Sequence, residues 1–338
     1  MPESKPLRVA IACNIKTNRS TDIEAEFDEP ETVEAIANAL RQGGYEPVVV
    51  EATSDFPQNL EAAAPDIVFN IAEGQEGPNR EAQVPALLEA LGIPYTGSDA
   101  LTLAQTLSKA LTNQVAQNHS IKTPACRLIP PAEASASIYL GDKLDFPVLV
   151  KPNAEGSSKG ISDDCVAQDL HHLRTLVESL RTTCAGDLLV EQYIDGREFT
   201  VGVLGNGDEL RIFEPMEIIY NKLRGSYKVY SYEVKRNFRD YISYECPSSL
   251  EIQMIKQLKH DAEAIYRIFG CRDYARLDFR LAADNQVYFI EINPIPGLAP
   301  DYSDYPMLAA FNGMEYDELI CTMLESALKR LGSGRETR

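Results

Sequence analysis

Two apolar stretches near the C-terminal end of the chain carry polar residues at alternate positions. Residues 274–280 read YARLDFR, and residues 287–293 read VYFIEIN. Because side chains alternate between the two faces of a strand, we expect Arg276 and Asp278 on one face of the first strand. By the same rule, Glu291 and Asn293 share one face of the second strand. A hairpin that turns at residues 283–286 would bring these four side chains together.

The four side chains have the chemistry of a metal and phosphate site. Two carboxylates and an amide oxygen are hard ligands, suited to a Mg²⁺ ion that bridges nucleotide phosphates. A neighbouring arginine can stabilise charge on a transferred phosphoryl group or an oxyanion. A solvated strand face fits less well, because the intervening residues are apolar and unpaired charge inside a sheet is costly. The pattern predicts metal ligands Asp278, Glu291 and Asn293, beside Arg276.

Two further segments agree with such a site, although neither is specific alone. An apolar strand over 146–150 leads to Lys151, and the loop 155–162 reads EGSSKGIS. Its small residues let backbone N–H groups approach phosphate oxygens, but it is neither a Walker A loop nor a GxGxxG loop. A surface turn is the better interpretation of that loop by itself. Residues 188–201 read LLVEQYIDGREFTV, a strand that can face an adenine edge, with Glu198 placed to hold ribose hydroxyls.

The balance of charge limits the partners. The 338 residues contain 51 acidic and 32 basic side chains, a net charge of −19, which disfavours binding to nucleic acid or to a membrane surface. Seven cysteines are scattered without a CxxC pair, which indicates reduced thiols rather than disulfides or a zinc site. The first seven residues lack the apolar core of a signal peptide, and no apolar run reaches membrane-spanning length. We expect a cytoplasmic protein.

Apolar patterns and turn residues divide the chain into three parts, residues 1–97, 98–189 and 190–338. The first part alternates short strands with amphipathic helices, which is typical of a small α/β layer with parallel strands. The elements expected there are 7–12, 30–42, 45–50, 66–71 and 81–91. In the second part we expect helices over 101–118 and 170–180, and strands elsewhere. In the third, helices over 250–269 and 316–331 flank the strand pair.

Five motifs, in order and spacing, resemble the ATP-grasp domain of D-alanine–D-alanine ligases. They are VKP, EGSSKGIS, VEQYIDGREFTV, ARLDF and IEINPIPG, and the resemblance is most specific from residue 128 to 297. Looser matches in IPYTGSDALTLAQTLSKALT and YSYEVKRN extend it over most of the chain. It implies an α/β (α+β) ATP-grasp fold preceded by a Rossmann-like pre-ATP-grasp domain. It also implies ATP and Mg²⁺ (or Mn²⁺) as cofactors, small-molecule partners and a homodimer.

The resemblance implies roles residue by residue. The residues implied to bind ATP are Lys109, Lys151, Ser157, Ser158, Glu191, Gln192, Tyr193, Ile194, Glu198 and Lys235. The lysines contact phosphates, the serines belong to a loop that covers them, residues 191–194 face adenine, and Glu198 holds ribose. Asp278, Glu291 and Asn293 are the implied magnesium ligands. The implied catalytic groups are Arg276 and the backbone N–H of Gly297, which stabilise an oxyanion, with Lys235 and Ser158 near the γ-phosphate.

The chain departs from the family where the substrates bind. The motif that holds the first D-alanine has no match in the acidic segment 22–31. Glu73 stands where a histidine is usual, and Arg236 where a tyrosine is usual. Ser303 and Asp304 stand near the usual Ser-Leu pair of the second-substrate site. The candidate pocket residues are therefore Glu73, Glu76, Arg80, Glu81, Arg236, Ser303 and Asp304.

Two of these candidates have plainer interpretations. Glu81 suits the start of a helix, where a carboxylate is stabilised by the helix dipole. Arg236 can bind a substrate carboxylate through two hydrogen bonds, or it can be an ordinary exposed loop arginine.

In this family a carboxylate attacks the γ-phosphate of ATP, and an amine then displaces the phosphate. Intact ATP motifs beside a rewritten substrate pocket predict the same reaction type on other substrates. The chain is similar in length and character to the ligase-like enzyme of mycosporine-like amino acid biosynthesis, which joins serine or threonine to mycosporine-glycine. A true D-alanine–D-alanine ligase and a ligase for other dipeptides are the alternatives. A non-catalytic nucleotide-binding regulator is disfavoured, since Arg276 is kept together with the metal ligands.

Overall fold

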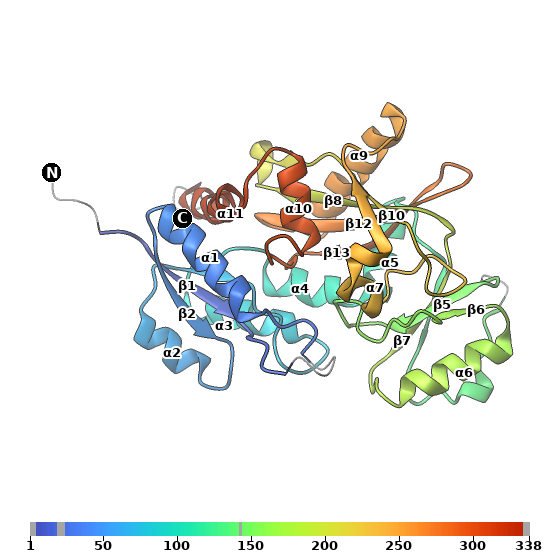
Figure 1. Cartoon of the computed structure of the whole chain (residues 1–338). Coiled ribbons are helices and arrows are strands. Elements are labelled where there is room, and N and C mark those ends of the chain that lie inside the picture. The colour runs from blue at the N-terminus through green and yellow to red at the C-terminus, as the bar shows by residue number, and fades with distance from the viewer. Residues whose placement is uncertain (1–4, 19–23, 142–143, 334–338) are drawn as a thin grey trace.

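The computed structural model describes residues 5–18, 24–141 and 144–333, and these contain three sheets (Figure 1). The N-terminal sheet is parallel, with strand order β2-β1-β3. Its strands are β1 (Arg8–Cys13), β2 (Glu46–Glu51) and β3 (Ile67–Asn70). Its helices are α1 (Pro30–Gln42), α2 (Phe56–Ala63) and α3 (Gln83–Leu91), with a 3-10 turn, η1 (Arg80–Ala82), before α3. The predicted parallel α/β layer is confirmed.

The helix α2 was missing from the prediction. It is eight residues long, and only Phe56, Leu60 and Ala63 are buried. Three apolar positions in so short a segment do not establish a helical period, so the packing of α2 onto its sheet decides its structure.

A second, four-stranded sheet follows, with order β4-β7-β5-β6. Its strands are β4 (Cys126–Ile129), β5 (Val148–Pro152), β6 (Val166–Ala167) and β7 (Leu188–Gln192). Helix α6 (Leu170–Arg181) packs on it through Leu173 and Val177, as its predicted amphipathic pattern requires. A domain boundary between residues 189 and 190 would divide β7, so a boundary after Gln192 fits this sheet better.

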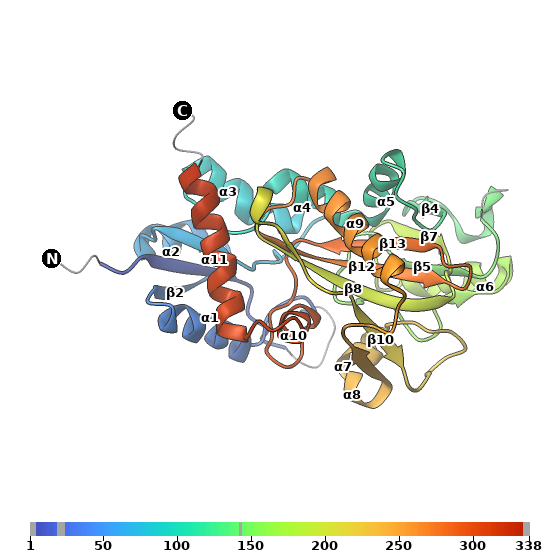
Figure 2. The ribbon, with the colours of Figure 1, turned by 90° about the horizontal axis from the view of Figure 1, so that it is seen from above.

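The third sheet has six strands, in the order β11-β10-β8-β12-β13 with β9 paired to β8. They are β8 (Gly196–Leu204), β9 (Arg211–Ile212), β10 (Met216–Tyr220), β11 (Ile242–Glu245), β12 (Tyr274–Ala282) and β13 (Val287–Asn293). The helices around it are α7 (Tyr232–Arg236), α8 (Phe238–Tyr241), α9 (Ile252–Ile268) and α10 (Asp304–Phe311). The last helix, α11 (Tyr316–Ser333), lies beside α1 (Figure 2), so the C-terminal part closes the core of the N-terminal unit.

The predicted hairpin of charged strands is present, with one irregularity. Strands β12 and β13 pair antiparallel, and Arg276 lies opposite Asn293 while Asp278 lies opposite Glu291. The register shifts between Asp278 and Phe279, where a β-bulge interrupts the pairing. Phe289 and Ile292 therefore both enter the same hydrophobic core, although strict alternation would place them on opposite faces.

The helix predicted over 101–118 is two helices, α4 (Ala100–Leu107) and α5 (Lys109–Asn118). They separate at Ser108, whose backbone is extended. Asn153 supports this break, because its carbonyl accepts the Lys109 N–H at 3.1 Å, its Oδ1 accepts the Ala110 N–H at 2.9 Å, and its Nδ2 donates to the Ser108 hydroxyl at 3.1 Å. The break places Lys109 on the first turn of α5, facing the cavity described below.

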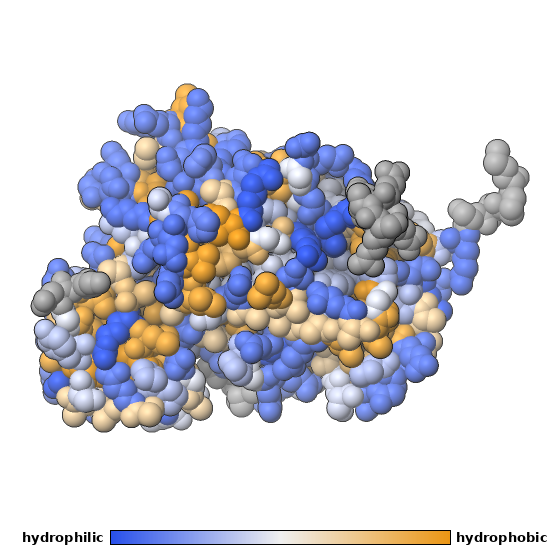
Figure 3. All heavy atoms as spheres, turned by 180° about the vertical axis from the view of Figure 1, so that it is seen from behind, coloured by the Kyte–Doolittle hydropathy of each residue, from blue (hydrophilic) through white to orange (hydrophobic). Residues whose placement is uncertain are grey.

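The remaining predictions concern the surface, membrane-spanning helices and the cysteines. The face opposite to Figure 1 interleaves hydrophilic and hydrophobic residues (Figure 3). Among the described residues, no helix has both the length and the apolar character needed to cross a bilayer. All seven cysteines are free thiols, as their spacing predicted. Residues 1–4, which contributed to the prediction about a signal segment, lie outside the described residues.

We expect Asn153→Ala to destabilise the protein and to weaken ATP binding. The buried Asn153 side chain satisfies the first turn of α5, so its loss should lower the free energy of unfolding by about 1–2 kcal/mol. Because Lys109 then loses its fixed position, KM for ATP should rise. Urea denaturation and steady-state kinetics measure both effects. Asn118→Ala, at the exposed far end of α5, is the matched control, and equal effects of the two substitutions would contradict this account.

Candidate active site

A cavity of about 560 Å³ lies where the three sheets come together. Residues after β3, on β5 and β7, and on β12 and β13 all line it, together with the loops 155–158 and 229–236. Three of the predicted residues differ from the others: Glu76 is exposed and does not line the cavity, Arg80 is buried but does not line it, and Arg236 lines it at an exposed position. Every other predicted binding, catalytic or metal-binding residue contributes to the lining.

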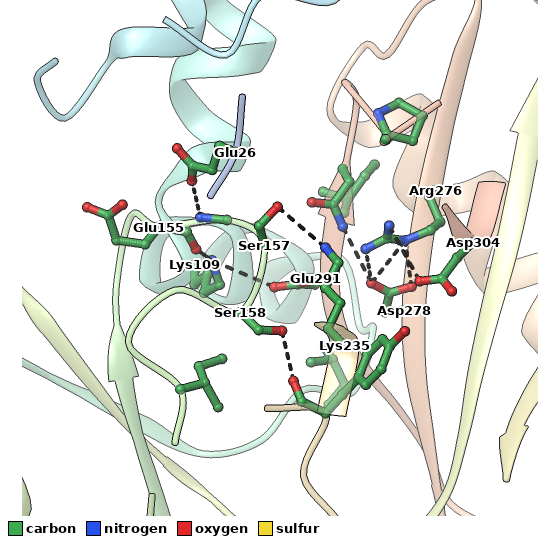
Figure 4. Close-up of a pocket in the computed structure, with 18 of the residues that line it drawn as sticks. Glu26, Lys109, Glu155, Ser157, Ser158, Lys235, Arg276, Asp278, Glu291 and Asp304 are labelled. Carbon is green, nitrogen blue, oxygen red and sulfur yellow. Dashed lines mark hydrogen bonds and ion pairs between the residues drawn. The ribbon is translucent and has the colours of Figure 1, made fainter. Parts of the chain in front are cut away.

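The paired strands β12 and β13 bring the predicted metal ligands together. The Arg276 guanidinium lies 2.9 Å from Asp278, and the Asn293 amide nitrogen donates to Asp278 at 3.4 Å (Figure 4). Burial raises the pKa of Asp278, and the charge of Arg276 partly offsets this rise. Burial also acts to raise the pKa of Glu291, but Lys109, Lys151 and Arg276 outweigh it and lower the pKa to about 2. Both strands thus hold carboxylates at the cavity wall among several cations.

These residues fit a magnesium ion. Asp278 and Glu291 lie opposite each other in the register, and the Asn293 side chain donates through nitrogen, which leaves its amide oxygen free as a ligand. Oxygen ligands of this kind suit Mg²⁺ and Mn²⁺. The assignment of these three residues as ligands remains a prediction.

The end of the cavity predicted to bind nucleotide contains a buried ion pair. Lys151 Nζ lies 2.6 Å from Glu191 Oε1, and each residue is only 4% exposed. Burial acts to lower the pKa of Lys151, but Glu191 and Glu291 raise it overall, so the lysine stays cationic. Within the described chain, Glu191 Oε2 is buried without a hydrogen-bond donor. An unsatisfied buried acceptor costs about 1–3 kcal/mol, and an adenine amino group would satisfy it.

Glu198, the predicted ribose ligand, is held in place by two neighbours. The Arg280 guanidinium lies 2.6 Å from Glu198 Oε2, and the Tyr220 hydroxyl donates to the same oxygen at 2.7 Å. Arg280 was not among the predicted site residues. Its position two residues after Asp278 on β12 could have identified it, because alternation places both on the same face.

Two loops meet over the cavity, as their predicted role in covering the phosphates requires. The Ser158 hydroxyl donates to the Tyr230 carbonyl at 2.8 Å, and Lys235 donates to the Ser157 hydroxyl at 3.4 Å (Figure 4). Ser157 and Ser158 have positive φ angles of 49° and 56°, and such backbone in non-glycine residues is strained by about 1 kcal/mol each. The contacts to Tyr230 and Lys235 help to hold this conformation. Burial, and then the charge of Arg276, lowers the pKa of Lys235.

The predicted oxyanion and second-substrate residues lie on the other side of Arg276. Gly297, Ser303 and Asp304 line the cavity together. The Ser303 hydroxyl accepts the Ala299 N–H at 3.1 Å, which fixes the turn that carries Gly297. Asp304 accepts a hydrogen bond from Tyr244 at 2.9 Å and lies 3.9 Å from the Arg276 guanidinium. The Asp304 carboxylate therefore lies beside Arg276, in the region where the second substrate is predicted to bind.

The acidic segment after β1 supplies residues that the motifs did not identify. Arg80 forms two hydrogen bonds with Glu26, at 3.0 and 2.5 Å, and both residues are buried. Glu26 also accepts the Gly156 N–H, so this segment contacts the phosphate loop. Asp28 lines the cavity with Glu73 and Glu81. The acidity of residues 22–31 was the only signal in the sequence, and residues 19–23 lie outside the described part of the chain.

Comparison with known proteins agrees with this geometry. Residues 131–325 match the family profile described as D-ala D-ala ligase C-terminus. The chain is 31% identical to the uncharacterized protein y4sG of Sinorhizobium fredii, with 97% of this chain and 99% of that protein covered. It is 32% identical to the D-alanine–D-alanine ligase of Aquifex aeolicus, over 87% and 93% of the two chains. The chain belongs to the D-alanine–D-alanine ligase family.

Solved structures identify the fold of this family member. The D-alanine–D-alanine ligase from Bacillus anthracis, complexed with ATP, superposes with a TM-score of 0.75 at 21% identity and covers 97% of this chain and 99% of its own. The ligase from Coxiella burnetii gives 0.72 at 22% identity, over 98% and 97%. The predicted ATP-grasp fold is therefore confirmed, and the protein is an ATP-grasp ligase.

The buried acid Glu81 should make stability depend on pH. Burial, and then repulsion from Glu26, raises the pKa of Glu81 from 4.5 to about 7. Because the folded state binds this proton more tightly than the unfolded state, stability from this group falls as the pH rises from about 4.5 to about 7. Glu81→Gln should therefore gain stability relative to wild type with rising pH, on the order of 2 kcal/mol by pH 8.

Urea denaturation of both proteins at pH 5 and pH 8 measures this difference. Glu61→Gln, exposed on α2, controls for the substitution itself. A stability difference between wild type and Glu81→Gln that is the same at both pH values would contradict the assignment.

Proposed function

We propose that this ligase uses ATP and Mg²⁺ to phosphorylate an oxygen of a small carboxylate or carbonyl substrate, and joins that substrate to the amine of an amino acid. One observation carries the proposal: a single cavity holds the cations suited to polyphosphate, two carboxylates suited to a metal, and an arginine beside them. The cations are Lys109, Lys151, Lys235 and Arg276. The ATP complex of the Bacillus anthracis ligase, which shares the fold, supports the choice of nucleotide.

The proposed reaction has two steps. A substrate oxygen attacks the γ-phosphorus, the bond from that phosphorus to the β–γ bridging oxygen breaks, and ADP leaves. The amine nitrogen then attacks the activated carbon, phosphate leaves with its oxygen, and the nitrogen loses a proton. Lys235 and the loop with Ser157 and Ser158 enclose the transferred group, and the Mg²⁺ ion would neutralise phosphate charge. Arg276 and the Gly297 N–H are the donors proposed for the developing oxyanion.

The identity of the two substrates is open to proposal. Glu73, Arg236 and Asp304 replace usual family residues around the acceptor, which favours a substrate other than D-alanine. Mycosporine-glycine joined to serine or threonine is one candidate, in which a carbonyl oxygen is activated. D-alanine joined to D-alanine is the alternative, supported by the names of relatives such as those in Bordetella avium and Aquifex aeolicus. We also propose a homodimer, by analogy with the family, which sedimentation would measure.

A direct test is phosphate release from ATP with Mg²⁺, followed by mass analysis of products. The panel contains D-alanine, L-amino acids, and mycosporine-glycine with serine or threonine. Release that requires a carboxylate or carbonyl substrate together with an amine supports the proposed ligase. Nucleotide binding without release on any substrate would instead favour the non-catalytic nucleotide-binding regulator.

Arg276→Lys should slow the reaction without preventing ATP binding. Lysine keeps the positive charge beside Asp278 but cannot present the planar pair of donors, so transition-state stabilisation is lost. We expect kcat to fall about 100-fold or more, with KM for ATP changed little. Arg267→Lys, on the outer face of α9 where Arg267 pairs with Glu263, is the matched control. A kcat that stays within twofold of wild type would remove Arg276 from the proposed mechanism.

A further inference from the structure

Three carboxylates at the N-terminal side of the cavity have no cation of their own. Asp28, Glu73 and Glu81 all line it. Within the described chain, none of the three carboxylates forms a hydrogen bond or an ion pair, although Glu81 is only 9% exposed. Other acids lie close enough to repel these carboxylates. Glu81 and Asp28 raise the pKa of Glu73, and Glu26 raises the pKa of Glu81.

The neighbouring cations are engaged elsewhere. Arg80 pairs with Glu26 and donates to the Ala154 carbonyl at 2.8 Å. Lys109 donates to the Glu155 carbonyl at 2.7 Å and lies 3.7 Å from Glu291. Lys16 lies 3.5 Å from Glu29. Lys16 attracts Asp28, and Arg80 attracts Glu73 and Glu81, but within the described chain none of these cations forms a salt bridge with the three carboxylates.

Such a cluster is costly in the free protein. Burial raises the pKa of Asp28 to about 7, and burial with the repulsion from nearby acids raises that of Glu81 to about 7 as well. A bound cation would remove both the repulsion and part of the desolvation cost. These carboxylates therefore favour a positively charged ligand over a neutral one.

The arrangement favours an extended organic cation over a metal ion. Throughout residues 5–18, 24–141 and 144–333, no three His, Cys, Asp or Glu side chains converge as metal ligands would. Asp28 follows the β1 loop, Glu73 follows β3, and Glu81 lies in η1, so the three charges reach the cavity from different elements. Three carboxylates that enter one cavity from different elements can bind a ligand with more than one charged nitrogen group.

We propose that the phosphoryl acceptor is a small carboxylic acid with two cationic nitrogen groups, as in a diamino acid or arginine, held by Asp28, Glu73 and Glu81. The inference rests on the proposed function, which places an acceptor oxygen beside Lys235 and Arg276 in the same cavity. One carboxylate can hold the α-ammonium, and the others hold the side-chain ammonium or guanidinium. The substrate carboxylate then points away from the acids and toward these cations.

The test compares matched acceptors. Ornithine, lysine and arginine, each as the D and L form, are paired with norvaline, norleucine and citrulline, which have similar length and no side-chain charge. Phosphate release is measured with ATP, Mg²⁺ and a mixture of amino-acid amine donors. We expect kcat/KM at least 10-fold higher for the basic member of each pair. Equal or better turnover of the neutral members would overturn the inference and leave the proposed ligase intact.

Three variants test which carboxylates hold the basic acceptor. Asp28→Asn, Glu73→Gln and Glu81→Gln should each lower kcat/KM for the basic acceptor about 10-fold or more. In two of the three variants the neutral counterpart should change little, because only one carboxylate holds the α-ammonium that both acceptors carry. The melting temperature of each free variant should equal or exceed that of wild type, because a repelling charge is removed, and this separates lost binding from lost folding. Glu61→Gln, exposed on α2, should change neither quantity. Equal losses for basic and neutral acceptors in all three variants would overturn the assignment of these residues.

Measurements of acceptor binding test the cationic site independently of the proposed reaction. Calorimetry with a non-hydrolysable ATP analogue reports acceptor affinity without turnover. Basic acceptors that bind but release no phosphate would support the cationic site while contradicting the proposed ligase activity. Absence of binding preference for the basic acceptors would overturn the inference, whatever the enzyme turns over.

Discussion

The register of strand β12 is the constraint on which the active site depends. Arg276, Asp278 and Arg280 line the cavity, whereas Leu277 and Phe279 enter the hydrophobic core on the other face. Each of these buried apolar side chains stabilises the fold by about 2–3 kcal/mol, and a shift of one residue would exchange the two faces. The apolar residues thus fix the position of the charged ones on the opposite face of β12.

The carboxylates at the two ends of the cavity differ in whether they are paired with a cation. At the nucleotide end, the acid Glu191 pairs with Lys151 and Glu198 pairs with Arg280, so each carboxylate has a cation. At the N-terminal side, Asp28 and Glu73 have none in the described chain. Although the molecule has a net charge of −19, Lys109, Lys151, Lys235 and Arg276 line the cavity where polyphosphate is proposed to bind. The same enzyme can therefore attract a polyanion at one end and a cation at the other.

Alternation of side chains along β12 and β13 predicted that Arg276, Asp278, Glu291 and Asn293 come together, and all four line one cavity. Three features depended on contacts between distant segments and could not be predicted. The break at Ser108 depends on Asn153, 45 residues away. The bulge that turns Phe289 inward follows from packing against the core of β8 and α9. Asp28 is held at the cavity by backbone pairing with the segment after β1, since its N–H donates to the Asn14 carbonyl at 2.9 Å and its carbonyl accepts the Lys16 N–H at 2.8 Å.

The difference between residues on strands and residues on connections explains how one fold can serve different substrates. The predicted metal ligands and several of the predicted ATP residues, such as Lys151, Glu191 and Glu198, lie on strands of the second and third sheets, where a substitution disturbs register and core together. Glu73 and Asp28 lie on connections after strands of the N-terminal sheet, where side chains can change without moving a strand. The fold is kept at 21% identity to the Bacillus anthracis ligase, with a TM-score of 0.75. The proposed acceptor pocket lies on these connections, so its charges can change without moving β12, which carries Arg276 and Asp278.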